Sequence, residues 1–188
     1  TYDGSTAMPG LVLSASGKVT GDALTLSGNG AYALKHAGSN LGYTVSGLTL
    51  GGADAANYHL AGGVTSLTGN DGVITPAKLV LTSANVVKTY DRSTSAAGLA
   101  QATAGTQLWG TDSISGGSFA FSDKRAGTGK TVTVSGVTVN DGNGGNNYSV
   151  SYVNNTNSTI NAKALTASFS ASNKTYDGSA TAAVTGAS

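Results

Sequence analysis

The stretch KTVTVSGVTV, residues 130–139, decides the fold class. Valine alternates with threonine or serine on both sides of Gly136, which is the period of a β-strand with one buried face. The apolar positions change phase at this glycine, and glycine tolerates the backbone angles of a β-bulge or a tight bend. We therefore predict a bent strand in which Val132 and Val134 face a core and the intervening threonines face solvent.

The same pattern occurs once more, around Gly47, because the chain is internally repeated. The tripeptide Thr-Tyr-Asp occurs three times, and its tyrosines, Tyr2, Tyr90 and Tyr176, lie 88 (90 − 2) and 86 (176 − 90) residues apart. Four further landmarks recur with nearly the same offset: residues 35–38 match 124–127, 45–49 match 134–138, 57–58 match 147–148, and 74–78 match 160–163. A unit of this length can bury a small core of its own, so the repeat is a domain and not a solenoid rung.

The strand that leads into each Thr-Tyr-Asp tripeptide marks where a unit opens. Residues 79–88 precede Tyr90, and residues 165–174, in which apolar and polar residues alternate, precede Tyr176. We therefore expect three parts: residues 1–78 as a first repeat module without its opening strand, 79–163 as a complete second module, and 164–188 as the opening strand and Tyr-Asp motif of a third.

Composition agrees with an all-β chain. Hydrophobic residues make up 39% of the 188 residues and charged residues only 10%, so the polar surface consists mainly of Thr, Ser, Asn and Gly, which suit strand faces and turns. No segment keeps the 3.6-residue apolar period of a long helix. The Gly- and Asn-rich segments 69–72 and 140–142 are predicted to be turns.

Charge and cysteine content exclude several classes of function. The formal net charge is +1 without a basic stripe, so we expect no nucleic-acid partner. No apolar stretch approaches the ~20 residues of a membrane-spanning helix, so we expect no membrane insertion. The chain has no Cys, which excludes disulfides and thiolate metal sites and suits export of a long polypeptide.

Four motifs resemble the YDG and MBG repeat modules of large secreted bacterial adhesins, of the filamentous haemagglutinin and biofilm-matrix kind. They are residues 88–91, 123–132, 50–58 and 74–78. The sequence departs from the family pattern at Arg92 and at residues 140–145, and these departures concern turn geometry more than the fold.

The resemblance implies tandem small β-sandwich-like modules, Ig-like or related, arranged end to end outside the cell, at the bacterial surface or in the biofilm matrix. Their expected role is that of a structural stalk or spacer supporting attachment or matrix cohesion, with the neighbouring modules as partners. The short segments 75–78 and 161–163 leave little slack between modules. The alternative is a carbohydrate-binding module for exopolysaccharide or host glycan.

Candidate catalytic residues are few. His36 and His59 are the only histidines, and their repeat counterparts are Arg125 and Ser149, so repeated chemistry cannot depend on them. No Ser-His-Asp order and no paired acids occur, and Glu is absent. We expect no enzyme activity and no catalytic, cofactor-binding or metal-binding residues.

Two weaker candidates for ligand binding remain. The loop with Asp141, Asn143, Asn146 and Asn147 is rich in oxygen atoms and a possible calcium site, although a plain loop is favoured because one carboxylate supplies little charge. Trp109, with Tyr148 or Tyr152 nearby, is a candidate for stacking on a sugar ring, although a single Trp usually packs in or near the core.

The repeated Tyr-Asp pair itself has a structural interpretation. The tyrosine is expected to anchor the edge of the core, and the aspartate to fix the turn that follows. A less favoured alternative is an isopeptide bond from Lys88 or Lys174, which the absence of Glu argues against.

Overall fold

The computed structural model describes residues 1–187 and is all-β, as expected. Two short 3-10 turns, η1 and η2, are the only helical segments among the described residues. The elements are β1 Thr25–Tyr32, β2 Gly38–Gly51, η1 Ala55–Asn57, η2 Ala61–Gly63, β3 Ser66–Ile74, β4 Ala77–Ser83, β5 Val87–Thr89, β6 Ala100–Ala102, β7 Ser113–Phe121, β8 Gly127–Asn140, β9 Tyr148–Tyr152, β10 Asn155–Asn161, β11 Phe169–Ala171 and β12 Val184–Ala187.

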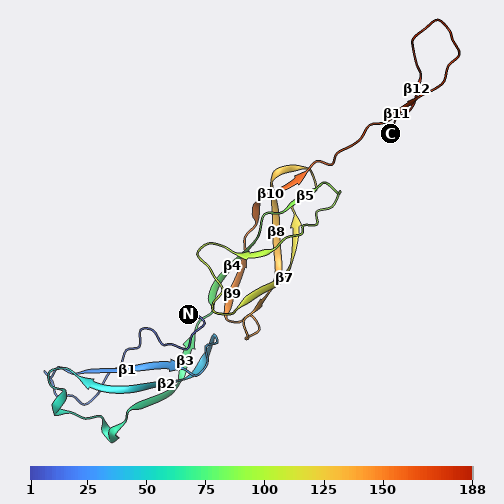
Figure 1. Cartoon of the computed structure of the whole chain (residues 1–188). Coiled ribbons are helices and arrows are strands. Elements are labelled where there is room, and N and C mark those ends of the chain that lie inside the picture. Colours follow the sequence, from blue (N-terminus) through green and yellow to red (C-terminus); the bar gives the residue numbers. More distant parts are fainter. Residues whose placement is uncertain (188) are drawn as a thin grey trace.

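The strands form four small sheets. The first repeat contributes the antiparallel sheet β1-β2-β3, and the second contributes β5-β10-β8-β7 and β6-β4-β9. Figure 1 places the β1–β3 sheet at one end of the molecule, the sheets of the second repeat in its middle, and the β11–β12 pair at the other end. No helix among the described residues is long and apolar enough to cross a membrane.

The second repeat buries two apolar clusters. The first is built around Leu79 and Leu81 of β4, and the second around Val132 of β8 and Ile160 of β10. The opening strand, expected to run unbroken over residues 79–88, is divided in two. Strand β4 belongs to one sheet and β5 to the other, so the chain changes sheets between them.

The predicted bend in residues 130–139 is confirmed. Val132 and Val134 are buried, whereas Thr133 is exposed. Gly136 has φ 63°, a left-handed conformation that favours glycine, and beyond it the apolar face of β8 turns toward the other cluster, where Val139 is buried. One glycine thus lets a single strand serve both clusters.

The first repeat bends at its own glycine with a true bulge. Gly47 has φ 65°, and the pairing of β1 with β2 shifts by one residue between Ser27 and Asn29. In the second repeat the partner strand also carries a left-handed glycine, Gly116 with φ 66°, and the register of β7 with β8 does not shift.

The turn expected at residues 69–72 is wrong, because these residues lie within β3. Their glycines make room for tyrosine rings: a Cβ added to Gly69 would lie 2.3 Å from the ring of Tyr43. The Tyr43 hydroxyl donates to Asp71 Oδ1 at 2.9 Å, so Asp71 also contributes a contact between β2 and β3. The turn expected at residues 140–142 is confirmed, since β8 ends at Asn140.

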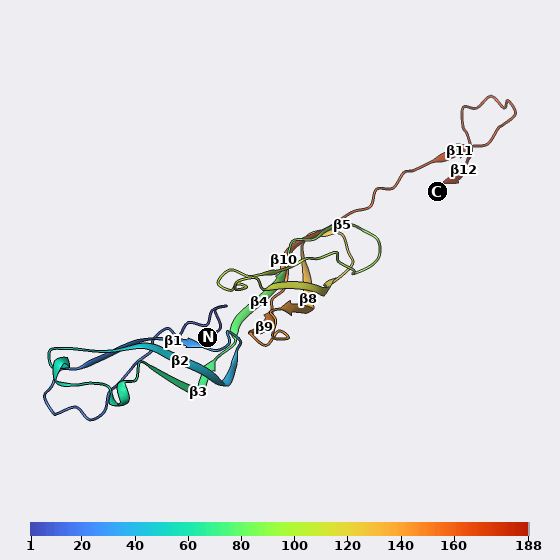
Figure 2. The same ribbon diagram turned by 60° about the horizontal axis from the view of Figure 1, so that its bottom comes forward.

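The tail beyond β10 is exposed. Leu165 and Phe169 are 93% and 77% exposed, so the half-buried strand expected over residues 165–174 is not formed. Only β11 is a strand there, and its partner is β12, which supplies no core for the apolar side chains to face. Figure 2 shows the tail leading away from the second repeat.

Candidate functional site

The most distinctive polar cluster joins the two repeats at Asp112. Its Oδ2 accepts two tyrosine hydroxyls, from Tyr2 at 2.8 Å and from Tyr148 at 2.7 Å. The Tyr148 hydroxyl in turn accepts the backbone N–H of Trp109 at 2.7 Å. Tyr2 is held at the end of β3, because its backbone N–H donates to the Thr75 carbonyl at 2.7 Å. We call Tyr2, Asp112 and Tyr148 the tyrosine joint.

Both tyrosines of the tyrosine joint are buried, and Asp112 is half-buried. Tyr2 is 1% and Tyr148 5% exposed, and their rings meet edge to face with centroids 5.4 Å apart. They share one apolar cluster with Ile74 of the first repeat and Leu79 of the second. In Figures 1 and 2 the N-terminus lies between the β1–β3 sheet and the second repeat, which is where this contact requires it.

Burial and the nearby carboxylate change the acidity of both tyrosines. Burial, followed by the hydrogen bond to Asp112, raises the pKa of Tyr2 to about 12. The same two causes raise the pKa of Tyr148 well above its ordinary range. A tyrosinate at either position would place a second negative charge beside Asp112, so both hydroxyls stay protonated at neutral pH.

A second contact lies beside the tyrosine joint. The backbone N–H of Ala37 donates to Asn147 Oδ1 at 2.8 Å, and Asn147 Nδ2 lies 3.2 Å from His36 Nδ1. Asn143 Nδ2 also donates to Asn147 Oδ1, at 2.9 Å. Asn147 is fully buried, and we call this set of contacts the asparagine joint.

The loop that carries Asn147 is organised by Asp141. Oδ1 of Asp141 accepts the backbone N–H groups of Asn143 and Gly145, both at 2.8 Å, and Oδ2 accepts that of Asn147 at 2.9 Å. Burial pushes the pKa of Asp141 upward, but these backbone donors outweigh it, and the pKa lies below its ordinary value. The carboxylate considered as a calcium ligand is thus engaged by the backbone. No group of three or more His, Cys, Asp or Glu side chains suited to a metal ion occurs among residues 1–187.

The Asp of each Thr-Tyr-Asp tripeptide fixes the following turn, as predicted. Oδ1 of Asp3, Asp91 and Asp177 accepts the backbone N–H two residues further on, at 2.9 Å in all three copies. Lys88 Nζ closes the second copy of this turn with 2.9 Å bonds to Asp91 Oδ1 and to the carbonyls of Ser93 and Ser95. The hydrogen bond from Lys88, together with that from the backbone N–H of Ser93, lowers the pKa of Asp91 to about 2.

The aromatic residues considered for sugar stacking do not form one exposed platform. Trp109 is half-buried against the cluster that contains Leu79, and Tyr148 is buried. Tyr152 is 39% exposed, and its hydroxyl accepts the N–H of Val137 at 3.1 Å. Of the two histidines, His36 belongs to the asparagine joint and His59 is exposed.

Sequence reasoning did not find Asp112, the centre of the tyrosine joint. A signal for it was present, because Asp22 stands 36 residues before Tyr58 just as Asp112 stands 36 residues before Tyr148. In both repeats the tyrosine hydroxyl donates to the aspartate. A search for residue pairs with a repeated spacing would have identified the aspartate.

The family comparison agrees with the repeat seen in the structure. The model of the YDG domain matches residues 1–68 and again residues 75–157. The chain belongs to the YDG domain family. Neither the curated proteins nor the solved structures include a significant match.

This match corrects the resemblance drawn from the sequence. The four motifs were assigned to YDG/MBG-type modules of large secreted bacterial adhesins, and that assignment is wrong as stated. What matches is the YDG domain, in two copies, with neither an MBG module nor an adhesin attached to it. The comparison therefore supports membership of the YDG domain family and nothing more specific.

Proposed function

We propose that this pair of YDG repeats is a structural spacer: β-sandwich-like modules placed end to end that hold an attachment region of an extracellular protein away from its anchor. The observation that carries the proposal is the tyrosine joint, in which Tyr2 of the first repeat is buried against the second repeat. A spacer needs joints that keep neighbouring modules at a fixed distance and angle.

Three features support a stiff joint. Strands β3 and β4 are separated by only two residues, Thr75 and Pro76, which leaves little chain to bend. The tyrosine joint and the asparagine joint connect the repeats through two separate sets of side chains. The asparagine joint includes Asn147, whose backbone is fixed by Asp141. Rotation between the repeats would break both sets at once.

The joint offers structural interactions and no reaction chemistry. Asp112 Oδ2 is engaged as the acceptor of two tyrosine hydroxyls, and burial with these bonds raises the pKa of both tyrosines. We therefore propose a non-enzymatic role without a cofactor. An extracellular location, at the cell surface or in a matrix, is part of the same proposal and is supported by the lack of Cys in the chain.

Small-angle X-ray scattering of the full chain tests the spacer proposal. At concentrations where each protein is monomeric, we compare the natural sequence with Asp112→Ala, and use Asp22→Ala as the matched control, because Asp22 is the repeat counterpart that lies away from the joint. The proposal predicts that Asp112→Ala alone adds flexibility between the repeats. This should be seen as a smaller radius of gyration and a raised high-angle plateau in the Kratky plot. Identical curves for all three proteins would remove the joint from the account.

The rival function is recognition of exopolysaccharide or host glycan. A glycan array probed with the full chain separates the two functions, and Trp109→Ala is the matched variant. Saturable binding that is lost in Trp109→Ala would replace the spacer proposal with carbohydrate binding. The half-buried position of Trp109 against the core leads us to expect no such binding.

A further inference from the structure

An apolar hollow opens on the first repeat. It measures about 270 Å³ and is lined mainly by half-buried or exposed apolar side chains. Its apolar lining includes Leu26, Leu48, Leu50, Tyr58 and Leu60.

The second repeat fills the corresponding place with strand β4. The repeat counterparts of the lining residues are Ile114, Val137, Val139, Tyr148 and Val150. All five belong to the cluster that packs around Leu79 and Leu81 of β4. Strand β9, which begins at Tyr148, also pairs with β4 in parallel. The hollow is thus the place of a β4-like strand, and among residues 1–187 no strand pairs with the segment from Tyr58 to Leu60 there.

The polar part of the joint is present beside the hollow as well. The Tyr58 hydroxyl donates to Asp22 Oδ2 at 2.5 Å and accepts the N–H of Val19 at 2.9 Å. These three residues reproduce Tyr148, Asp112 and Trp109 of the second repeat. Within the described part of the chain, no second tyrosine donates to Asp22 in the way that Tyr2 donates to Asp112. Among residues 1–187, the first repeat therefore has the counterparts of Asp112 and Tyr148 but no tyrosine in the position of Tyr2.

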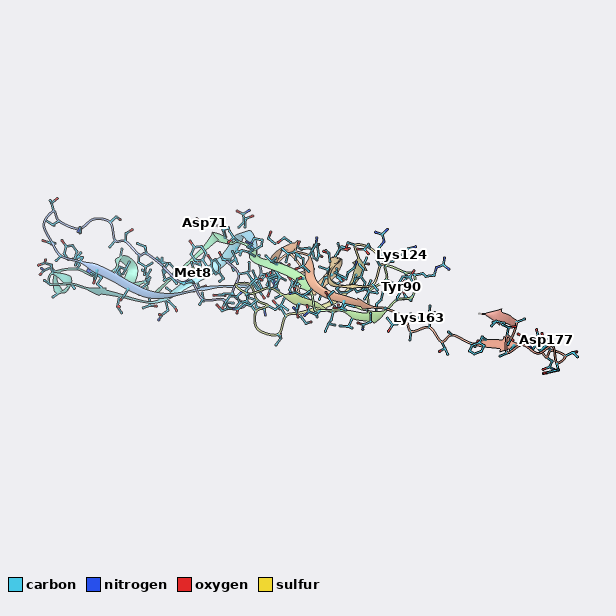
Figure 3. The ribbon with its side chains drawn as sticks, turned by 90° about the horizontal axis from the view of Figure 1, so that it is seen from above. Met8, Asp71, Tyr90, Lys124, Lys163 and Asp177 are labelled. Atoms are coloured by element: carbon cyan, nitrogen blue, oxygen red, sulfur yellow. The ribbon has the colours of Figure 1, made fainter. Side chains whose placement is uncertain are left out.

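Counterparts of Tyr2 and of strand β4 lie at the other end of the same chain. Tyr90 is the counterpart of Tyr2, and its backbone N–H donates to the Asn161 carbonyl at 2.8 Å, as that of Tyr2 does to Thr75. Figure 3 shows Tyr90, Lys124 and Lys163 at one end of the second repeat, where the tail begins. The tail then supplies Leu165 and Phe169 in a segment that corresponds to β4, and both side chains are exposed.

We propose that two copies of this chain associate head to tail. Residues 164–169 of one copy enter the hollow of the next as a parallel strand beside Tyr58 and Leu60, and the Tyr90 hydroxyl donates to Asp22 of that next copy. The association repeats, between chains, the contact that the structure shows within one chain. Because the two surfaces differ, the contact is heterologous, and it leads to strings of copies at high concentration.

The copy whose hollow receives the strand needs little rearrangement. Tyr58 and Leu60 already have extended backbones, with φ −132° and ψ 157° for Tyr58 and φ −70° and ψ 127° for Leu60. Only the η2 turn, Ala61–Gly63, has to open if the paired strand is to reach the length of β9. Strand addition gains backbone hydrogen bonds and buries apolar side chains that are exposed in the free chain.

Sedimentation velocity over a concentration series tests the proposal. We expect association of the full chain to increase with concentration, and to be abolished in the double variant Leu165→Asp/Phe169→Asp. Both side chains are exposed in the free chain, so the variant leaves its fold intact. Val184→Asp, also at an exposed apolar residue of the tail, is the matched control and should associate normally. A full chain that is monomeric at every concentration overturns the proposal, and so does unchanged association of the double variant.

Further variants test which residues meet. Tyr90→Phe removes one hydrogen bond to a carboxylate and should weaken association about tenfold, whereas Tyr176→Phe should not.

The variant Leu60→Glu blocks the hollow but keeps the tail, and the Leu165→Asp/Phe169→Asp variant does the reverse. Each alone should be monomeric, and their mixture should form dimers that grow no further. Mixtures that stay monomeric or grow beyond dimers contradict the head-to-tail arrangement. These readouts concern contact between chains, so they can fail while the spacer proposal stands.

Discussion

Tyr2 and Tyr148 meet edge to face, with their ring planes at 76°, and donate to the same oxygen of Asp112. One carboxylate therefore satisfies two buried hydroxyls that come from different repeats. Because a buried hydroxyl without a partner is costly, this arrangement concentrates the stability of the joint in a single side chain.

Replacing Asp112 should therefore destabilise the chain more than replacing its repeat counterpart. We expect Asp112→Asn to lower the free energy of unfolding by about 1–3 kcal/mol, because the charge that accepts both hydroxyls is lost. Asp22→Asn should cost less, because Asp22 accepts one tyrosine hydroxyl and not two. Urea unfolding of the two variants measures the difference. Equal losses would mean that the second tyrosine contributes nothing.

Alkaline pH should weaken the joint. The pKa of Tyr2 is raised from 10.0 to about 12 by folding, so its contribution to stability is complete below about pH 10 and is lost as the pH rises toward about 12. Absorbance of tyrosinate during an alkaline titration should show late tyrosines that include Tyr2 and Tyr148, which ionise only as the joint opens. Hydrogen bonds to Asp71 and Asp22 also raise the pKa values of Tyr43 and Tyr58, which lie outside the joint. In Asp112→Asn, Tyr2 and Tyr148 should ionise earlier. If all eight tyrosines of the natural sequence ionise together near pH 10, the joint does not protect them.

Acid should weaken the turn that follows Tyr90. Asp91 has its pKa lowered from 3.8 to about 2, chiefly by the hydrogen bond from Lys88. Its contribution is therefore present above about pH 4 and is lost as the pH falls toward about 2. Lys88→Met should shift the pKa of Asp91 back toward its ordinary value, which carboxyl chemical shifts in NMR report. An unchanged titration in Lys88→Met would exclude the ion pair as the main cause.

A methyl group added at Gly69 should be far more costly than one added at Gly42. The new Cβ would lie 2.3 Å from the Tyr43 ring at Gly69, but 3.7 Å from its nearest neighbour at Gly42. We expect Gly69→Ala to lose about 1–3 kcal/mol through overpacking, and Gly42→Ala to stay near the natural stability. Thermal unfolding compares the two. Similar melting temperatures would show that Tyr43 moves aside without cost.

Much of the fold could be predicted from periodicity alone. The valines on either side of Gly136 alternate with polar residues, and this local signal gave the buried face and the bend. The turn predicted at residues 69–72 was wrong, because Gly and Asn favour turns unless tertiary contacts override them. Here the glycines make room for tyrosine rings from β2 and β1 to lie against β3, a contact that no local pattern reveals.

The joint was harder to predict than the fold. Tyr2 was expected at the edge of the core, and it is buried there. Its partner Asp112 belongs to the other repeat, so the pairing depends on how the repeats pack and not on any local motif. The exposure of Leu165 was also missed, since alternation predicts a strand face without showing whether a sheet is there to cover it.

The central claim is that the joint holds the two repeats at one distance, and a spin-label measurement tests it most directly. The chain has no Cys, so Thr44→Cys and Thr133→Cys place one label on an exposed, equivalent position of each repeat. Double electron–electron resonance should give one narrow distance distribution for this pair, and a broad one when Asp112→Ala is added. A broad distribution in the chain with Asp112 intact would contradict the account.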